Sequence, residues 1–186
     1  KKDEFSVDEP YNSEDWVDEL YKSEDEPFVI KLNEFIKPML AKKTQKAFDN
    51  PEWLFELKWD GYRAIGSNLH GKIQLYSRNG LSFMEKFKPI SRCFKRIHHD
   101  VILDGEIVAL DSEGKPQFQL LQNYESDPQG ELRYYVFDIL HLNGHNTMEL
   151  PLVERKSLIP EIIEDAPNCW YCDHVEGMGT AFFNHA

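Results

Sequence analysis

The residues best suited to chemistry in this sequence are a lysine and the charged side chains around it. Lys58 stands between Glu56 and Asp60, and apolar residues alternate with these three. Alternation with a period of two predicts a half-buried strand over residues 53–59, with the charged side chains on one face. A lysine fixed on a strand, with Arg63 just beyond an Asp-Gly turn, is a candidate nucleophile. The alternative is an ordinary amphipathic strand with a charged stripe in solvent, and the alternation alone favours that alternative.

A β-hairpin is predicted directly after this segment. Strands are expected at residues 62–69 and 72–78, joined by a two-residue turn at His70-Gly71. This turn sets a register in which the numbers of paired residues sum to 141, so Arg63 directly opposes Arg78. Like charges across a strand pair are destabilising unless an anion, either a phosphate or a carboxylate, lies between them. The alternatives are that the arginines splay into solvent or that the register slips.

The remaining pattern predicts an α+β fold. Apolar residues at helical spacing mark a core-facing helix at 83–97, and a helix at 152–163 carries a basic patch at Arg155-Lys156. Hairpins interrupted by helices indicate mostly antiparallel sheets with flanking helices that form a cleft. The other expected elements are a short helix near 43–48, strands at 100–110, 133–141 (followed by a turn at Asn143-Gly144) and 169–175, and a helix at 180–186.

Composition limits the classes of function. The 186 residues carry a net charge of −12, and residues 1–26 hold 11 acids against three lysines. Because phosphate binding favours basic surfaces, strong DNA binding by this chain alone is not predicted. No run of about 18 apolar residues exists, so no membrane span is expected. Three cysteines in an acidic chain indicate a reducing cytoplasm, with nucleoid association if the partner is DNA.

Cysteine and histidine spacing gives no strong signal for redox or metal chemistry. Cys169 and Cys172 have the spacing of a redox motif, but positions three apart on a strand point to opposite faces. His141 and His145 flank a turn, where the helical spacing of zinc ligands does not apply. We therefore expect neither a redox pair nor a zinc site.

Several ordered motifs resemble one family. Residues 58–63 read Lys-Trp-Asp-Gly-Tyr-Arg, which resembles the Lys-x-Asp-Gly-x-Arg signature of ATP-dependent DNA ligases and related covalent nucleotidyltransferases. Segments 77–80, 103–108 and 135–138 follow in the order that those ligases use. The resemblance covers roughly residues 28–186 and is strongest to the ligase domain of the bacterial end-joining ligase D, through segments 38–41, 118–122, 150–156 and 173–177.

This resemblance implies a site and a reaction. Lys58 would attack ATP, the AMP donor, to form lysyl-AMP, and AMP would then pass to a 5′-phosphate of nicked or broken duplex DNA, with Mg²⁺ or Mn²⁺ assisting and with end-joining proteins as possible partners. The nucleotide-binding residues implied are Glu56 at the adenine end, Leu57, Arg63 and Arg78 at phosphate or ribose, Glu106 at the ribose and the metal, and Phe137 stacked on adenine.

Local sequence leaves alternatives open for these residues. Asp104 and Glu106 could be a strand-end pair beside a bulge at Gly105, which permits close approach of a ligand or another backbone. By periodicity Phe137 belongs to the core, and the buried Asp138 needs a partner.

Activation of the lysine is not explained by its neighbours. An ordinary lysine amine has a pKa of about 10.4, and the acids beside Lys58 favour its charged form. A divalent metal or an arginine at the phosphates would have to offset them.

The sequence also departs from the family. The resemblance implies a Glu-Gly-x-Val-x-Lys segment and a later lysine, but at residues 176–179 Glu-Gly-Met-Gly is not followed by the required lysine. We therefore expect residues 1–27 to be an acidic tail or linker, and residues 28–186 to be the N-terminal part of an adenylation domain without its C-terminal part or OB-fold domain. Self-adenylation by these 186 residues alone is expected to be weak or absent.

Two rival functions remain. An RNA ligase or a capping guanylyltransferase shares the lysine signature, and a non-catalytic nucleotide-binding or partner-docking fragment would use the acidic tail for interaction. NAD as the adenylate donor is disfavoured, because Tyr62-Arg63 after the Asp-Gly resembles the ATP-using branch.

Overall fold

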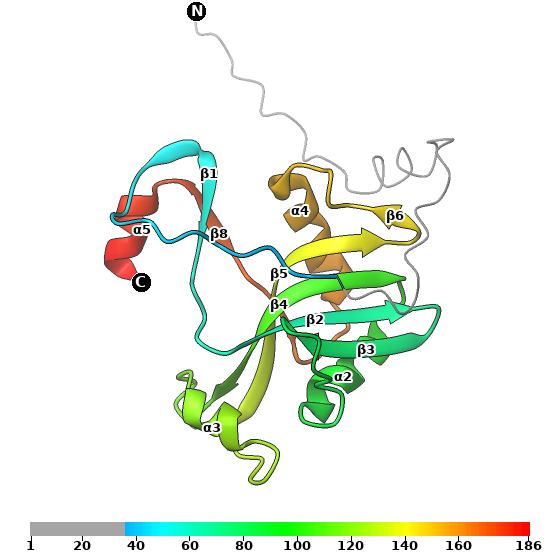
Figure 1. The fold of residues 1–186 in the computed structure, drawn as a ribbon. Helices are drawn as coiled ribbons and strands as arrows, with labels where there is room; N and C mark the ends of the chain where they lie inside the picture. The colour runs from blue at the N-terminus through cyan, green and yellow to red at the C-terminus, as the bar shows by residue number, and fades with distance from the viewer. Residues whose placement is uncertain (1–35) are drawn as a thin grey trace, which may run out of the picture.

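Two β-sheets organise the chain in the computed structural model, which describes residues 36–186 (Figure 1). The predicted acidic segment 1–27 lies outside the described residues. The larger sheet has the order β3-β2-β4-β5-β6, and β7 joins β5 as a parallel neighbour. The smaller sheet pairs β1 with β8. The strands are β1 (Asn50–Glu56), β2 (Tyr62–Leu69), β3 (Lys72–Ser77), β4 (Val101–Leu110), β5 (Glu131–Leu142), β6 (His145–Asn146), β7 (Cys169–Tyr171) and β8 (His174–Gly177).

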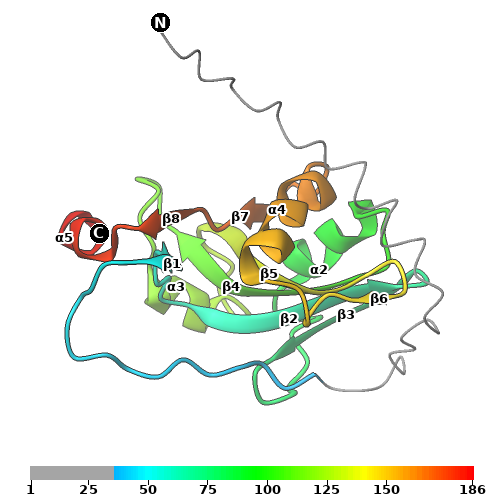
Figure 2. The same cartoon turned by 90° about the horizontal axis from the view of Figure 1, so that it is seen from above.

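Helices cover one face of the larger sheet and one end of the smaller. Helices α2 and α4 lie on the same face of the larger sheet, and α5 lies beside β1 and β8 (Figure 2). The helices are α2 (Lys88–Cys93), the 3₁₀-helix η1 (Phe94–Arg96), α3 (Phe118–Asn123), α4 (Leu152–Ile163) and α5 (Gly179–His185). The α+β class with mostly antiparallel sheets is confirmed, and the predicted bounds of the 152–163 helix are those of α4.

The β2–β3 hairpin has the predicted turn and register. His70 and Gly71 have φ angles of 51° and 77°. Positive φ at both turn residues matches the right-handed twist of the flanking strands. Ala64 pairs with Ser77 and Leu69 with Lys72, so the register that the sequence predicted is confirmed.

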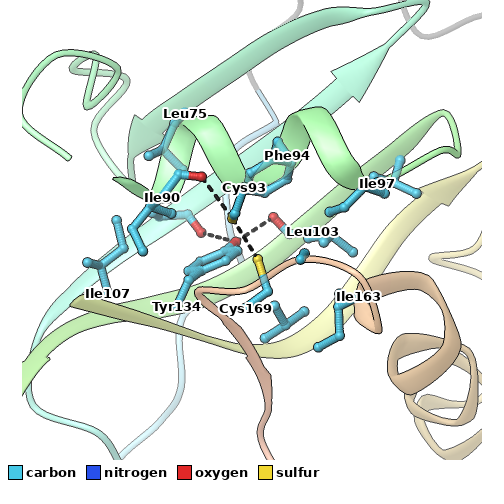
Figure 3. Packing of buried hydrophobic residues seen from close by; sticks show 14 of the residues in the cluster. Leu75, Ile90, Cys93, Phe94, Ile97, Leu103, Ile107, Tyr134, Ile163 and Cys169 are labelled. Carbon is cyan, nitrogen blue, oxygen red and sulfur yellow. Dashed lines mark hydrogen bonds between the residues drawn. The ribbon is translucent and has the colours of Figure 1, made fainter. Parts of the chain in front are cut away.

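The core lies between the larger sheet and its helices. Phe94 and Tyr134 are fully buried, and a Cβ atom added at Gly66 would lie 2.1 Å from Cζ of Phe94, so only glycine fits under that ring. Figure 3 shows Phe94 and Tyr134 beside Cys93 and Cys169, whose sulfur atoms lie 3.0 Å apart. Cys169 therefore lies against Cys93 and not against Cys172, and Cys172 belongs to another cluster, as opposite strand faces require.

Three predicted elements are wrong. The strand expected at 53–59 ends at Glu56, whose partner His174 is the first residue of β8, so Lys58 follows the strand and does not lie on it. The helix expected at 83–97 begins at Lys88 because Pro89 occupies its first turn, and a proline ring clashes with the backbone one turn before it. Residues 43–48 form a bend and no helix.

The strand expected at 169–175 is divided between the two sheets. β7 pairs with β5, and the Cys172 amide still donates to the Val136 carbonyl at 2.8 Å. The chain then leaves the larger sheet, and β8 pairs with β1. The chain therefore crosses between the sheets at residues 57–61 and again at residues 172–173, and the candidate site lies along the first crossing.

Candidate functional site

Gly61 fixes the crossing segment that carries Lys58. A Cβ atom at Gly61 would lie 2.1 Å from the Ile107 carbonyl oxygen, so a glycine is required for this close approach to β4. The Gly61 backbone lies near enough to the Glu106 carboxylate to lower its pKa. The Asp-Gly pair thus serves here mainly to bring the chain against β4, and it places the exposed Lys58 within electrostatic reach of Glu106.

Glu106 is a carboxyl group held near the lysine in an unusual electrostatic state. Burial raises its pKa to about 7, while the Gly61 backbone and the charges of Lys58 and Arg63 act in the opposite direction. Arg63 on β2 is the direct cross-strand partner of Glu106. A carboxyl group that titrates near neutral pH beside an amine is typical of functional sites.

Arg63 is held by a carboxylate within the protein. Its Nε and Nη2 atoms donate to the two oxygens of Asp104 at 3.0 and 2.6 Å, and Nη1 donates to the Met39 carbonyl at 2.6 Å. Hydrogen bonding to Asp104 raises the pKa of Arg63; burial raises the pKa of Asp104 and the arginine opposes that effect. The guanidinium lies 5.3 Å from the centre of the Phe137 ring. The β2–β3 pairing ends at Ala64 and Ser77, so the predicted pairing of Arg63 with Arg78 is not formed. Arg78 is an exposed turn residue, and the anion that holds Arg63 is Asp104.

A second arginine–aspartate pair lies on the neighbouring strand. Asp138 faces Asp104 across β4 and β5, and Arg155 donates to both its oxygens at 2.7 and 2.9 Å. Arg155 also donates to the Leu150 carbonyl at 2.6 Å. The partner that the buried Asp138 required is therefore an arginine from α4, and bidentate pairs of this kind fix both side chains.

Lys156, the next residue on α4, is the most deeply buried charge among the described residues. Its side chain is 0% exposed and forms a salt bridge with Glu56, whose side chain is 28% exposed. Nζ also donates to the carbonyls of Cys172 at 2.8 Å and Phe137 at 3.4 Å. The predicted basic patch at Arg155-Lys156 is wrong, because both cations point inward to carboxylates.

Aromatic and apolar side chains occupy the other side of the crossing segment. The Trp59 indole stacks on Tyr135, with ring centres 3.8 Å apart and planes 9° apart. Beyond Trp59 and Leu57 is a pocket of about 210 Å³ on the side of β8 and α5. Its lining residues are Leu57, Trp59, Tyr171, Cys172, Asp173, His174, Val175 and Phe182.

The structure brings most of the candidate residues into one region. Arg63, Glu106 and Lys58 interact electrostatically, Phe137 lies under the Arg63 guanidinium, and Glu56 is linked to the Phe137 backbone through Lys156. Leu57 lines the pocket, and Arg78 is the candidate for which the described residues show no contact to this cluster.

Sequence reasoning missed the structural role of Lys156. The signal was available, because Lys156 lies three and seven residues before Ile159 and Ile163 and therefore shares their buried helix face. A lone cation on an apolar helical stripe predicts a buried partner. The partner, Glu56, lies 100 residues earlier in the chain and could not be assigned from the pattern.

Neither a multi-residue metal cluster nor a membrane-crossing helix is found in the part of the chain that the structure describes. Residues 36–186 hold no group of three or more His, Cys, Asp or Glu side chains arranged around a common point. No helix within the same residues is long and apolar enough to cross a bilayer.

The fold defines the class: it is that of ligase adenylation domains, and here it carries an exposed lysine on a crossing between two sheets, within electrostatic range of Glu106. The sequence model of the ATP-dependent DNA ligase domain family matches residues 38–178, and the chain belongs to this family.

Similar proteins agree with this assignment. The SPbeta prophage-derived DNA ligase-like protein LigB of Bacillus subtilis is 31% identical over 82% of the chain, which covers 56% of that protein. The multifunctional non-homologous end joining DNA repair protein LigD of Mycobacterium tuberculosis is 30% identical over 92% of the chain, which covers 22% of that protein. The crystal structure of the LigD ligase domain from M. tuberculosis matches with a TM-score of 0.60 and 28% identity, covering 70% of this chain and 43% of that one.

Proposed function

We propose that this chain carries the adenylate-accepting lysine of an end-joining DNA ligase. The Lys58 amine attacks the α-phosphorus of ATP, a phosphorus–nitrogen bond forms, the bond to pyrophosphate breaks, and the amine loses a proton. AMP then passes to the 5′-phosphate of nicked or broken DNA, and attack by the 3′-hydroxyl seals the strand and releases AMP. Placement and charge neutralisation dominate phosphoryl transfer of this kind.

The observation that carries the proposal is that Lys58 lies within electrostatic range of Glu106, whose cross-strand partner is Arg63. Charged side chains from two strands of the larger sheet are therefore proposed to act on the amine. An arginine fork suits phosphate or ribose oxygens, and Phe137 beside it offers an aromatic face for a base. The exposed Arg78, in the turn just after β3, is proposed to bind the phosphates of ATP.

The protein offers one carboxylate, Glu106, as a ligand for a divalent cation at this site. Mg²⁺ in nucleotide sites is usually held by one or two carboxylates together with the phosphates, and we propose that Glu106 would hold it here. When bound, the ion would neutralise phosphate charge and so lower the barrier to attack.

The complete reaction is proposed for a longer polypeptide. The chain spans 56% and 22% of the lengths of the LigB and LigD relatives. Residues 28–186 are proposed to be the N-terminal part of the adenylation domain, with residues 1–27 as an acidic tail. Because the 186 residues include no Glu-Gly-x-Val-x-Lys segment, we expect weak adenylation by these residues alone.

The test is adenylation with ATP labelled at the α-phosphate in the presence of Mg²⁺. An acid-labile label is expected on Lys58, weak for the 186 residues and absent in Lys58→Ala, while Lys115→Ala, which changes an exposed lysine, should label as the wild type does. A parallel reaction with labelled GTP distinguishes the two enzyme classes, because a guanylyltransferase would take its label from GTP and an ATP-dependent ligase from ATP.

The outcomes of this test separate the functions. Label that persists in Lys58→Ala contradicts the proposal, and absence of both ATP binding and label in the wild-type protein favours the non-catalytic docking function. Strong labelling of the 186 residues would contradict the expectation of weak activity but not the role of Lys58.

A further inference from the structure

An exposed segment at residues 39–47 connects the two sheets by a route separate from the crossing at residues 57–61. All nine of its residues are exposed, and they form no helix or strand. Figure 2 shows this segment on the side of the larger sheet away from α2 and α4. The segment therefore covers a part of the sheet that no helix covers.

Contacts at both ends fix this segment in place. At its start, the Met39 carbonyl accepts a hydrogen bond from Nη1 of Arg63 at 2.6 Å. Just beyond its end, the Phe48 ring packs edge-on against Trp53 and Phe55 of β1, with ring centres 5.2 and 5.3 Å away. The segment therefore begins at the candidate site, where a proposed nucleotide-binding residue holds it, and ends at the smaller sheet.

The charge of this segment is opposite to that of the chain. It contains Lys42, Lys43 and Lys46 and no acidic residue, whereas the whole chain carries −12. Within the described part of the chain, none of these three lysines forms a salt bridge, whereas the exposed Lys88 and Lys115 are each paired with a glutamate. Because an acidic surface repels a polyanion, a local group of unpaired cations is the part of this protein suited to bind one.

Resting on the proposed function, we propose that residues 39–47 bind the phosphate backbone of the duplex DNA whose 5′-phosphate receives AMP. Lysines that neutralise phosphates release condensed counterions, which favours binding without any base recognition. The chain advances by at most about 3.3–3.6 Å per residue, and the phosphates of one DNA strand are spaced by about 3.4 Å along the helix axis. The lysines between residues 42 and 46 can therefore contact neighbouring phosphates of one strand.

The test is the salt dependence of binding to a short, fluorescently labelled nicked duplex, measured by anisotropy without ATP. Each lysine–phosphate contact contributes about 0.9 to the slope of log K against the logarithm of the salt concentration. Lys42→Gln combined with Lys43→Gln should therefore reduce the magnitude of this slope by about 1.8 and weaken binding about tenfold or more at ~50 mM salt. The matched control, Lys88→Gln combined with Lys95→Gln, removes the same charge from exposed lysines on α2 and η1, and its slope should stay within about 0.5 of the wild-type slope.

The outcomes separate this surface from its alternatives. Equal slopes for the two double variants overturn the inference, as does the absence of DNA binding by the wild-type protein at low salt. Polyglutamate tests the class of partner, because binding of polyglutamate as tightly as DNA would show a surface for any polyanion and overturn the assignment to DNA. Absence of label on Lys58 in the adenylation reaction would overturn the proposed function and leave the DNA measurement unchanged.

Discussion

The two sheets of this molecule are stabilised in different ways, although both contribute to one site. The larger sheet has a core in which Phe94 and Tyr134 are fully buried. The smaller sheet has two strands, and the side chains around it include Trp53, 54% exposed, and Phe183, 70% exposed. An isolated pair of strands is marginally stable in water. The smaller sheet therefore depends on its links to the larger one.

Those links determine how the candidate nucleophile is placed. Glu106, Arg63 and Phe137 belong to the well-packed sheet, whereas Lys58 follows the last residue of β1. The described links include the close approach of Gly61 to Ile107 on β4, the Trp59–Tyr135 stack and the Lys156–Glu56 salt bridge. The comparison shows that the hydrophobic core of the larger sheet positions Glu106, Arg63 and Phe137. Lys58, in contrast, is positioned by a few specific contacts between the two sheets.

The largest loss of stability is expected in the core of the larger sheet, for Phe94→Ala on η1. The fully buried ring packs against Gly66, and its removal leaves a cavity, so the free energy of unfolding should fall by about 3–5 kcal/mol. Urea denaturation followed by circular dichroism measures this change. A loss below about 1 kcal/mol would show that the larger sheet does not depend on this core.

The next effect tests the salt bridge between the sheets, and it should be asymmetric. Glu56→Ala leaves the buried Lys156 ammonium unpaired, and we expect a loss of about 3 kcal/mol. Lys156→Met leaves a carboxylate that is partly exposed and can be hydrated, so the loss should be about 1 kcal/mol. Chemical denaturation of both variants measures which one loses more unfolding free energy. Equal losses would contradict the expectation drawn from the different burial of Lys156 and Glu56.

The pH dependence of stability should reveal Glu106. Its folded pKa of about 7 lies above the ordinary value of 4.5 for a glutamate, so between these pH values the unfolded chain has released a proton that the folded chain retains. Stability from this group is complete below pH 4.5 and is lost as the pH rises through 7.

Replacing this carboxyl group should remove its pH-dependent contribution. We compare the free energy of unfolding of Glu106→Gln with that of the wild type. Because Glu106 is partly exposed and solvent screens its interactions, this difference should favour the variant by roughly 2 kcal/mol more at pH 8 than at pH 4. Thermal unfolding from pH 4 to pH 8, compared with the wild type, measures this difference. Parallel curves for the two proteins would mean that Glu106 titrates normally in the folded chain.

The smallest effect is expected on the smaller sheet, for Phe183→Ala on α5. The ring is largely exposed, so the free energy of unfolding should change by no more than about 0.5 kcal/mol. The same urea experiment as for Phe94→Ala provides the comparison of one phenylalanine with another. A loss of several kcal/mol would show that α5 and its sheet have a core of their own.

Local sequence determined the elements whose causes are local. The His70-Gly71 turn set the β2–β3 register, and the apolar pattern of residues 152–163 gave the bounds of α4. Ordered motifs also carried the family resemblance before any geometry was known. These features depend on backbone conformations and spacings within about 20 residues, which propensity and periodicity describe directly.

The tertiary structure alone decided how the charges are paired. Alternation predicted a strand through Lys58, but β1 ends where β8 provides its last partner, 118 residues further along the chain (Glu56↔His174). The register predicted that Arg63 opposes Arg78, whereas Arg63 is hydrogen-bonded to Asp104. The sequence predicted that Lys156 belongs to a basic patch, whereas its side chain is buried and paired with Glu56. The pairing of buried charges depends on which distant segments meet in low-dielectric surroundings, and the period of a single segment carries no information about that meeting.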